Sequence, residues 1–366
     1  MKNLMIVIIL FSIVGVLPRV DAAIYCVTDE TELLDALSEA KNNGENDQIH
    51  VQAGNYNNGT NGFSFNSAEN YDLEISGGWL RVGNFPCLIQ NSSPYLTVFD
   101  GNSVGPNLRF NMNFKGGLKI QNLSLINGAG ISPNRGVGLL IDGGGANGKN
   151  TLIEEVVFSN NNTTFCAALC FIGSSQLTVR NNVFVDNFAT SSTGVINIIN
   201  YETGVYFINN TILGNETGTP GASEPISGMQ IIVSDDAPAA VINNIFWDNM
   251  SGDFKVLAED PVASVIYVYQ NNYNVGYGDF DFVSGNLTAD PQLTGAGLFN
   301  FVPSLSSPMK NAGLMMTAIP PVPDFFDLWD HGTRDLIGGS RVKGNGIDIG
   351  ARESDPELPI FKNGFD

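Results

Sequence analysis

Charged residues are scarce in this chain, and basic residues are the scarcest. Only 15% of the 366 residues are charged, and 17 Lys and Arg stand against 37 Asp and Glu, a formal net charge of −20. So acidic a chain repels phosphate backbones and anionic lipid, and its sequence holds no basic cluster. The composition therefore argues against nucleic acid as a partner.

Histidine is almost absent, which bears on catalysis. His50 and His331 are the only two histidines, and neither has a Gly-x-Ser-x-Gly or similar motif nearby. A nucleophilic triad needs such an arrangement, so this class of enzyme is poorly supported.

The four cysteines form neither a CxxC nor a His-bearing metal pattern, which argues against zinc. In an exported chain they suggest two disulfides, and we favour the pair Cys26 and Cys87. Cys166 and Cys170 can pair only if the chain bends between them. Four extended residues span about 13 Å, whereas a disulfide requires a Cα separation below about 7 Å.

One long apolar run occurs, and it lies at the start of the chain. Lys2 precedes it, and small residues follow it at Val20 and Ala22. This pattern predicts a secretory signal peptide over residues 1–22, cleaved near Ala22. We expect the mature chain to be secreted or held at the cell surface, without a transmembrane segment.

What the sequence has in abundance is a repeated asparagine pattern. An Asn pair followed five residues later by another Asn begins at 181, 209 and 243, and weaker copies begin at 121, 154 and 271. Asn tolerates left-handed backbone geometry, and its amide can pair with the Asn of a neighbouring coil. We therefore expect a structural role for Asn182, Asn187, Asn210, Asn215, Asn244 and Asn249.

The segments around these pairs favour stacked strands. Apolar residues alternate before each pair, as at Leu177 and Val179, which is the period of a strand with one buried face. A second β-rich run precedes each copy, and the turn-like links leave no room for a helix. The predicted fold class is all-β, a right-handed parallel β-helix in which each coil buries its apolar face against its neighbours.

The ends of the chain depart from the repeat. Residues 29–40 place Leu33, Leu34, Leu37 and Ala40 on one face, which predicts a helix capping the solenoid before a first strand at 47–56. We divide the chain into a signal peptide (1–22), an N-terminal cap with the first strand (23–60), the coils (61–285), a loop-rich C-terminal cap wrapped over the last coils (286–353) and a tail (354–366). The tail is either a sorting signal or an unstructured end.

Several motifs together carry a family resemblance. They are the helix followed by the strand at 47–56, Ile-Ser-Gly-Gly-Trp at 75–79, Ala-Asp-Pro at 289–291 and Asp-Ile-Gly-Ala-Arg-Glu at 348–353. With these motifs nearly the whole mature chain resembles exported β-helix proteins of the choice-of-anchor Q type, in the pectate-lyase-like superfamily. The resemblance implies the architecture and an exported protein, but it fixes no reaction.

A polysaccharide lyase on this scaffold needs a base and usually calcium. Arg180 is the only basic residue between 150 and 254, although a solvated, outward-facing Arg is the competing interpretation. Candidate calcium ligands are Asp279, Asp281 and Asp290, which lack the spacing of an EF-hand. We expect no other cofactor.

A glycoside hydrolase needs two carboxyl groups about 5 to 9 Å apart. Asp142 ends one predicted strand and the pair Asp235 and Asp236 ends another, so they can fall on one face of the solenoid. Adjacent acids before Ala237 are equally what a turn uses. Glu154 and Glu155 are further outward-facing acids.

These patterns lead to two functional expectations. The first is a non-catalytic extracellular or cell-surface protein that contacts carbohydrate or another surface component, because the repeats lack a convergent catalytic set. The alternative is a carbohydrate-active enzyme, either a polysaccharide lyase or a glycoside hydrolase, that uses acids on one face of the solenoid.

Overall fold

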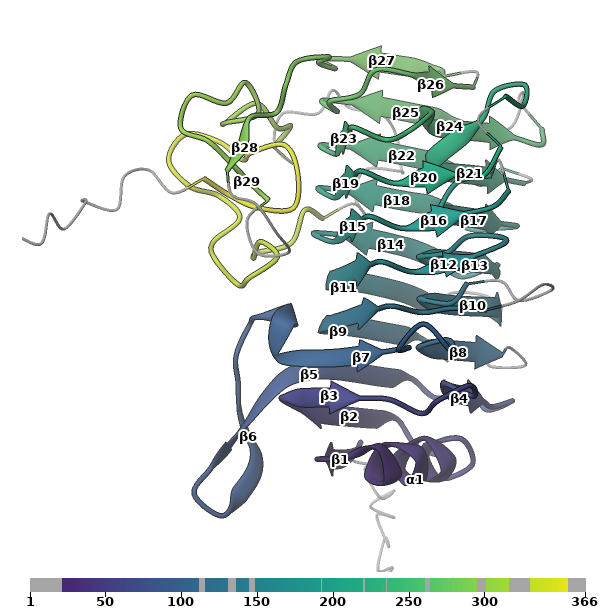
Figure 1. Cartoon of the computed structure of the whole chain (residues 1–366), viewed down its shortest axis with the longest axis vertical. Helices are drawn as coiled ribbons and strands as arrows, with labels where there is room; N and C mark the ends of the chain where they lie inside the picture. Colours follow the sequence, from purple (N-terminus) through teal and green to yellow (C-terminus); the bar gives the residue numbers. More distant parts are fainter. Residues whose placement is uncertain are drawn as a thin grey trace, which may run out of the picture.

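A stack of parallel strands runs the length of the molecule (Figure 1), which confirms the predicted parallel β-helix. The computed structural model describes residues 22–111, 116–130, 136–144, 149–191, 193–219, 221–234, 236–260, 264–278, 280–294, 301–315 and 330–354. The predicted signal peptide up to residue 21, the tail from 355 onward, Asp235 and Asp279 lie outside these residues.

The largest sheet contains 16 strands among the described residues. Its main row comprises β1 (Ala23–Val27), β2 (Asp47–Gln52), β5 (Leu73–Val82), β9 (Leu118–Ile126), β11 (Asn150–Ser159), β14 (Gln176–Arg180), β18 (Val205–Ile208), β22 (Ala239–Ile242), β25 (Ile266–Tyr269) and β27 (Phe282–Ser284). Beside it lie β3 (Gly54–Tyr56), β6 (Phe85–Gln90), β7 (Thr97–Asp100), β15 (Val183–Val185), β19 (Thr211–Leu213) and β23 (Ile245–Trp247).

A second and a third sheet close the coils. The second comprises β4 (Phe63–Asn66), β8 (Leu108–Asn111), β10 (Leu139–Gly144), β13 (Leu169–Gly173), β17 (Ile196–Asn200), β21 (Ile226–Val233), β24 (Gly252–Ala258) and β26 (Gly276–Tyr277). The third comprises β12 (Asn162–Thr163), β16 (Phe188–Ala189) and β20 (Glu216–Thr217). A short antiparallel pair, β28 (Leu293–Thr294) and β29 (Val302–Pro303), follows the coils.

The core lies inside the coils, where alternate side chains of each strand point. Leu177 and Val179 of β14 are fully buried, as their alternation predicts. Aromatic rings stack from coil to coil, with centroid separations of 4.6, 6.1 and 6.4 Å along Phe158, Phe184, Phe207 and Phe246. Because no coil can bury these rings alone, burial of apolar surface joins each coil to the next.

Two ladders of asparagine, here called the inner ladders, run along the stack; their last members, Asn249 and Asn286, are half-buried and the others are buried. Their members are Asn182, Asn210, Asn244, Asn271 and Asn286 in one, and Asn161, Asn187, Asn215 and Asn249 in the other. Each amide nitrogen donates to the amide oxygen of the next coil at 2.9 to 3.2 Å. The six asparagines predicted to be structural all lie in these ladders.

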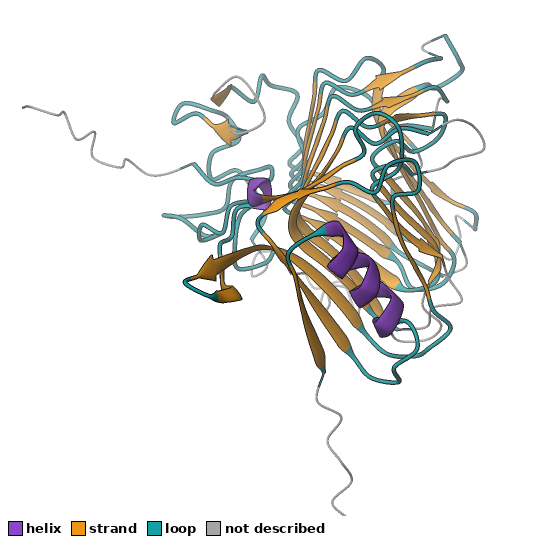
Figure 2. Ribbon diagram, turned by 60° about the horizontal axis from the view of Figure 1, so that its bottom comes forward, coloured by secondary structure: helices purple, strands orange, loops and turns teal. Residues whose placement is uncertain are grey.

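The N-terminal end carries the predicted helix, which lies across the end of the stack (Figure 2). Helix α1 (Glu30–Ala40) begins after Asp29, whose side chain accepts from the backbone N–H of Glu32. Leu33 and Leu37 are buried, whereas Leu34 is 39% exposed because its place on the helix turns it away from the sheets. The strand predicted to be first is preceded by β1, which pairs in parallel with β2.

Two disulfides hold irregular parts of the chain. Cys26 of β1 is bonded to Cys87 of β6, with a Cα separation of 5.8 Å. Cys166 is bonded to Cys170 across 5.3 Å, and its φ of 44° supplies the bend that so short a bridge requires.

Two segments leave the coils and lie against the same flank (Figure 1). The arm, residues 77–93, is the antiparallel extension formed by the end of β5 and by β6. The strap, residues 330–354, packs Leu336 against Val157 and Val183. We expected the C-terminal region to wrap over the last coils; the strap instead runs back along the stack, because the apolar side chains on this flank offer Leu336 a place to bury. No described helix is long and apolar enough to cross a membrane.

Candidate functional site

A polar pocket of about 270 Å³ lies where the arm, the bends of three coils and the strap meet. It is hereafter the Glu155 pocket. Its lining consists of Gln90 and Ser92 of the arm, Lys119, Gln121, Asn122, Glu154, Glu155 and Arg180 of the coils, and Thr333 and Arg334 of the strap. Segments more than two hundred residues apart in the sequence thus build one site.

The bends beside the pocket share a left-handed backbone position, here called the outer position. It is occupied by Asn122, Glu155, Asn181, Asn209, Asn243 and Gln270, with φ between 50° and 58°. Asn favours this geometry more than other residues with a Cβ do. Four of the six outer residues are therefore the type that this backbone favours. Glu155 and Gln270 are the other two, and Glu155 alone among the six carries a carboxyl group.

The outer asparagines also hold the flank segments. Asn122 donates to the backbone oxygen of Gly77 in the arm at 2.9 Å. Asn181 donates to the backbone oxygens of His331 and Arg334 in the strap at 3.2 and 3.0 Å. Glu155 lies between Asn122 and Asn181, and among the described residues it makes no such bond. The pocket therefore lies at the outer position whose side chain has no amide to donate to the arm or the strap.

The carboxyl group of Glu155 has an unusual environment. The residue is only 8% exposed. Burial and then the charge of Glu154 raise its pKa to about 7, against a smaller lowering by Arg334 and Lys119. A glutamate in left-handed geometry, where four of the other five outer residues are Asn, costs about 1 kcal/mol. Such a local cost next to a pocket points to a function that needs the carboxyl group.

Glu154 and Arg180 form the charged wall of the pocket. Arg180 Nη2 lies 2.7 Å from Glu154 Oε2, and Arg180 Nη1 lies 3.0 Å from Asp330 Oδ2 of the strap. Burial opposes the charge on Arg180, but Glu154 and Asp330 outweigh it and raise its pKa. Lys119 Nζ reaches Glu154 Oε1 at 3.5 Å. Arg180 is therefore an ion-paired residue under the strap, not a solvated one.

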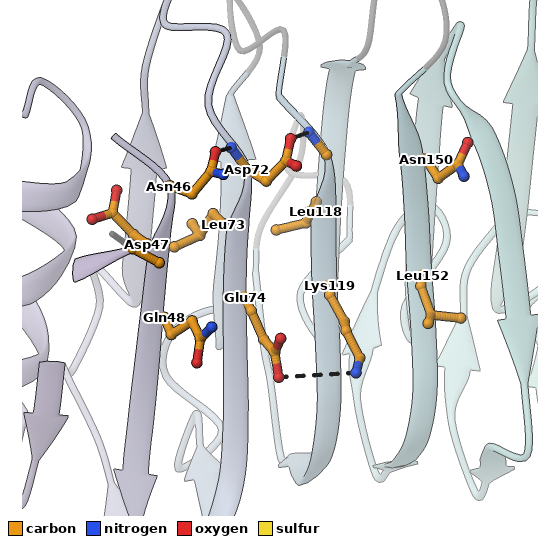
Figure 3. A pocket seen from close by; sticks show the side chains of 12 residues that line it. Asn46, Asp47, Gln48, Asp72, Leu73, Glu74, Leu118, Lys119, Asn150 and Leu152 are labelled. Atoms are coloured by element: carbon orange, nitrogen blue, oxygen red, sulfur yellow. Dashed lines mark hydrogen bonds and ion pairs between the residues drawn. The ribbon is translucent and has the colours of Figure 1, made fainter. Parts of the chain in front are cut away.

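A second hollow of about 360 Å³ adjoins this pocket and shares Lys119 with it. It lies across the outer face of β2, β5, β9 and β11, where Gln48, Glu74, Lys119 and Leu152 follow one another in register (Figure 3). Lys119 Nζ lies 3.9 Å from Glu74 Oε1. This hollow is the more open of the two, and no strap or arm residue lines it, so the Glu155 pocket is the stronger candidate.

The acids proposed for a hydrolase lie elsewhere. Asp142 is exposed at the end of β10, and in register it faces Ile172, then Ile199, then Ile232 of β21. Three strand steps amount to about 14 Å, which exceeds the separation of a carboxyl pair. Asp236 follows β21 and is exposed. Asp142 and Asp236 therefore do not form one site, and neither lines the Glu155 pocket.

The acids proposed for calcium have backbone partners instead. Asp281 Oδ2 accepts from the backbone N–H of Ile266 at 2.8 Å, and Asp290 Oδ1 accepts from that of Gln292 at 2.8 Å. Within the part of the chain that the structure describes, no three His, Cys, Asp or Glu side chains cluster as metal ligands would.

Sequence reasoning missed Glu155, Lys119 and Arg334 as members of one site. One signal was available for Glu155. Aligning the buried residues Ile153 and Val179, which face each other between β11 and β14, sets Glu155 opposite Asn181 and marks it as the acidic residue among the outer positions. Compared with protein-family models, curated proteins and solved structures, the chain matches none of them.

Proposed function

We propose that this chain is an exported β-helix protein that binds carbohydrate in the Glu155 pocket. The observation that carries the proposal is the lining itself, in which amides, hydroxyls, carboxylates and cations from three segments converge on one small volume. Sugar hydroxyl groups donate and accept hydrogen bonds, and these side chains supply both functions. At about 270 Å³ the pocket suits a compact polar ligand such as one sugar ring.

The exported location rests on separate grounds. The two disulfides fit an oxidising compartment, and residues 1–22 have the pattern of a signal peptide. We keep the resemblance to choice-of-anchor Q proteins as part of the proposal, since it rests on the sequence motifs alone. A cell-surface polysaccharide is the partner class that this location makes available.

A binding screen tests the proposal. The disulfide-bonded chain from residue 23 onward is titrated with neutral and acidic oligosaccharides by calorimetry, beside the variants Glu155→Gln and Asp142→Asn. Loss of one charged hydrogen-bond partner should weaken binding about tenfold or more in the first variant. Asp142 lies outside the pocket, so its variant should bind normally. Binding that Glu155→Gln leaves unchanged would contradict this placement of the site.

One observation favours an enzymatic alternative at the same site. A carboxyl group with a pKa of about 7 is suited to exchange protons near neutral pH, and Glu155 stands beside the ion-paired Glu154. A polysaccharide lyase or a glycoside hydrolase would use such a group as base or acid. Turnover should then fall about a hundredfold in Glu155→Gln, with and without calcium, and persist in Asp142→Asn. Binding without turnover would reject the enzyme.

A further inference from the structure

The strap is held together by ion pairs and hydrogen bonds of its own. Arg341 is fully buried within it, with its Nε 3.2 Å from Glu353 Oε1 and its Nη2 donating to the backbone oxygen of Asp348 at 2.8 Å. Arg352 Nε lies 3.3 Å from Asp335 Oδ2. These bonds join the two ends of the strap to each other. The backbone of Ile347 and Ile349 also bonds to residues 309–313, so the strap and that segment form one body.

The strap meets the coils through hydrogen bonds, through the Arg180–Asp330 ion pair and through buried apolar side chains such as Leu336. The backbone N–H of Gly350 donates to Asn243 at 2.8 Å, and that of Ala351 donates to Thr211 Oγ1 at 3.0 Å. The outer amides of Asn181 and Asn209 donate to strap carbonyls at 3.0 to 3.3 Å. At the pocket, by contrast, Arg334 Nη1 reaches across to Ser92 Oγ of the arm at 3.2 Å.

Glu155 occupies the outer position next to Asn181, where Thr333 and Arg334 of the strap line the pocket. An ionised carboxylate cannot donate to a strap carbonyl, and docking of the strap buries it. We infer that the strap is a closure of the Glu155 pocket. Glu155, in place of an asparagine at this outer position, keeps the docking of the strap weak enough for the pocket to open.

The charges around Glu155 set the direction of a pH effect. It faces Lys119 of β9, Glu154 of β11, Arg334 and Asp335 of the strap, and the Arg180–Asp330 pair lies beside it. Burial is the largest influence, and it acts against the ionised form. The docked strap is therefore more stable with Glu155 protonated, and docking weakens as pH rises through about 7.

Hydrogen exchange followed by mass spectrometry tests the inference on the disulfide-bonded chain without added ligand. The reporters are strap peptides that contain Gly350 and Ala351. Glu155→Asn should slow their exchange about tenfold at pH 8, because it replaces a charge that the docked strap buries with a neutral amide. Asn181→Ala should speed exchange about tenfold by removing two bonds.

Two further variants separate the causes. After correction for intrinsic rates, the wild type should lose strap protection between pH 6 and pH 8, whereas Glu155→Gln should not. His331 of the strap serves as the control, and His331→Gln should keep the wild-type pH dependence. Unchanged exchange in Glu155→Asn, or a pH dependence that survives in Glu155→Gln, would overturn the inference whether or not the pocket binds carbohydrate.

Discussion

The inner ladders should carry a large share of the stability, and Asn210 is the residue on which to measure it. Asn210 Oδ1 accepts from the backbone N–H and the side-chain amide of Asn182, both at 3.0 Å. Its own amide donates to Val179 O at 2.9 Å and to Asn244 Oδ1 at 3.1 Å. The residue is fully buried, so water cannot replace these partners.

Asn210→Ala leaves two buried N–H groups of Asn182 without an acceptor. Each such group costs about 1 to 3 kcal/mol, so the free energy of unfolding should fall by about 4 kcal/mol. Urea unfolding followed by tryptophan fluorescence measures the loss.

The matched control is Asn209→Gly, one residue earlier at the same bend. Glycine keeps the left-handed backbone, and the variant loses one 3.3 Å bond to His331, so it should cost about 1 kcal/mol. A loss in Asn210→Ala no larger than in Asn209→Gly would refute the view that the ladders support the coils.

Three other outcomes follow from buried groups and bridges. Because the pKa of Glu155 rises from 4.5 to about 7 on folding, its penalty is absent below pH 4.5 and reaches about 3 kcal/mol by pH 8. Between pH 4.5 and pH 8, Glu155→Gln should therefore become more stable than the wild type by about 3 kcal/mol. If urea unfolding gave the two proteins parallel pH profiles of stability, this penalty would be excluded. Arg341→Met leaves Glu353 buried without its ion-pair partner, so the free energy of unfolding, measured by thermal unfolding, should fall by about 3 to 5 kcal/mol. A loss below about 1 kcal/mol would show that the ion pair is dispensable. Replacing Cys26 and Cys87, 61 residues apart, with Ser should lower the free energy of unfolding by about 4 kcal/mol, because their disulfide closes a long loop in the unfolded chain. Replacing Cys166 and Cys170, four residues apart, should lower it by about 2 kcal/mol. Equal losses would contradict the dependence on loop length.

The sequence predicts the fold well because the same pattern of buried apolar residues and bend asparagines recurs in many coils. Alternating residues such as Leu177 and Val179 define the buried face, and asparagines recur where a bend needs left-handed geometry and a side chain that both donates and accepts. The register of the weaker copies is harder to read. The Glu154–Glu155 pair aligns with Arg180 and Asn181, one residue away from the alignment that the paired letters suggest, because strand pairing follows the buried residues.

The candidate site is largely hidden from sequence reasoning. Arg180 and Asp330 meet across 150 positions, and Arg334 and Ser92 across 242. The strap has neither strand alternation nor helical periodicity, so no local pattern states where it docks. Its position depends on Leu336 finding an apolar place on the flank, which is a property of the folded coils rather than of any short segment.

The asparagine ladders are also directional, and that direction bears on how each ladder ends. Every rung before the last donates its amide to the rung of the following coil. The first ladder ends at Asn286, whose amide donates to Val268 O at 2.9 Å, whereas the second ends on a residue that accepts without passing the donation on. Asp253 does this for the second ladder: its Oδ1 accepts from Asn249 at 3.0 Å, and its Oδ2 accepts from the backbone N–H groups of Asn274 and Val275. A carboxylate has no proton to offer, so the series stops there. The second ladder therefore ends in a group that accepts hydrogen bonds from both sides and offers none to a further coil.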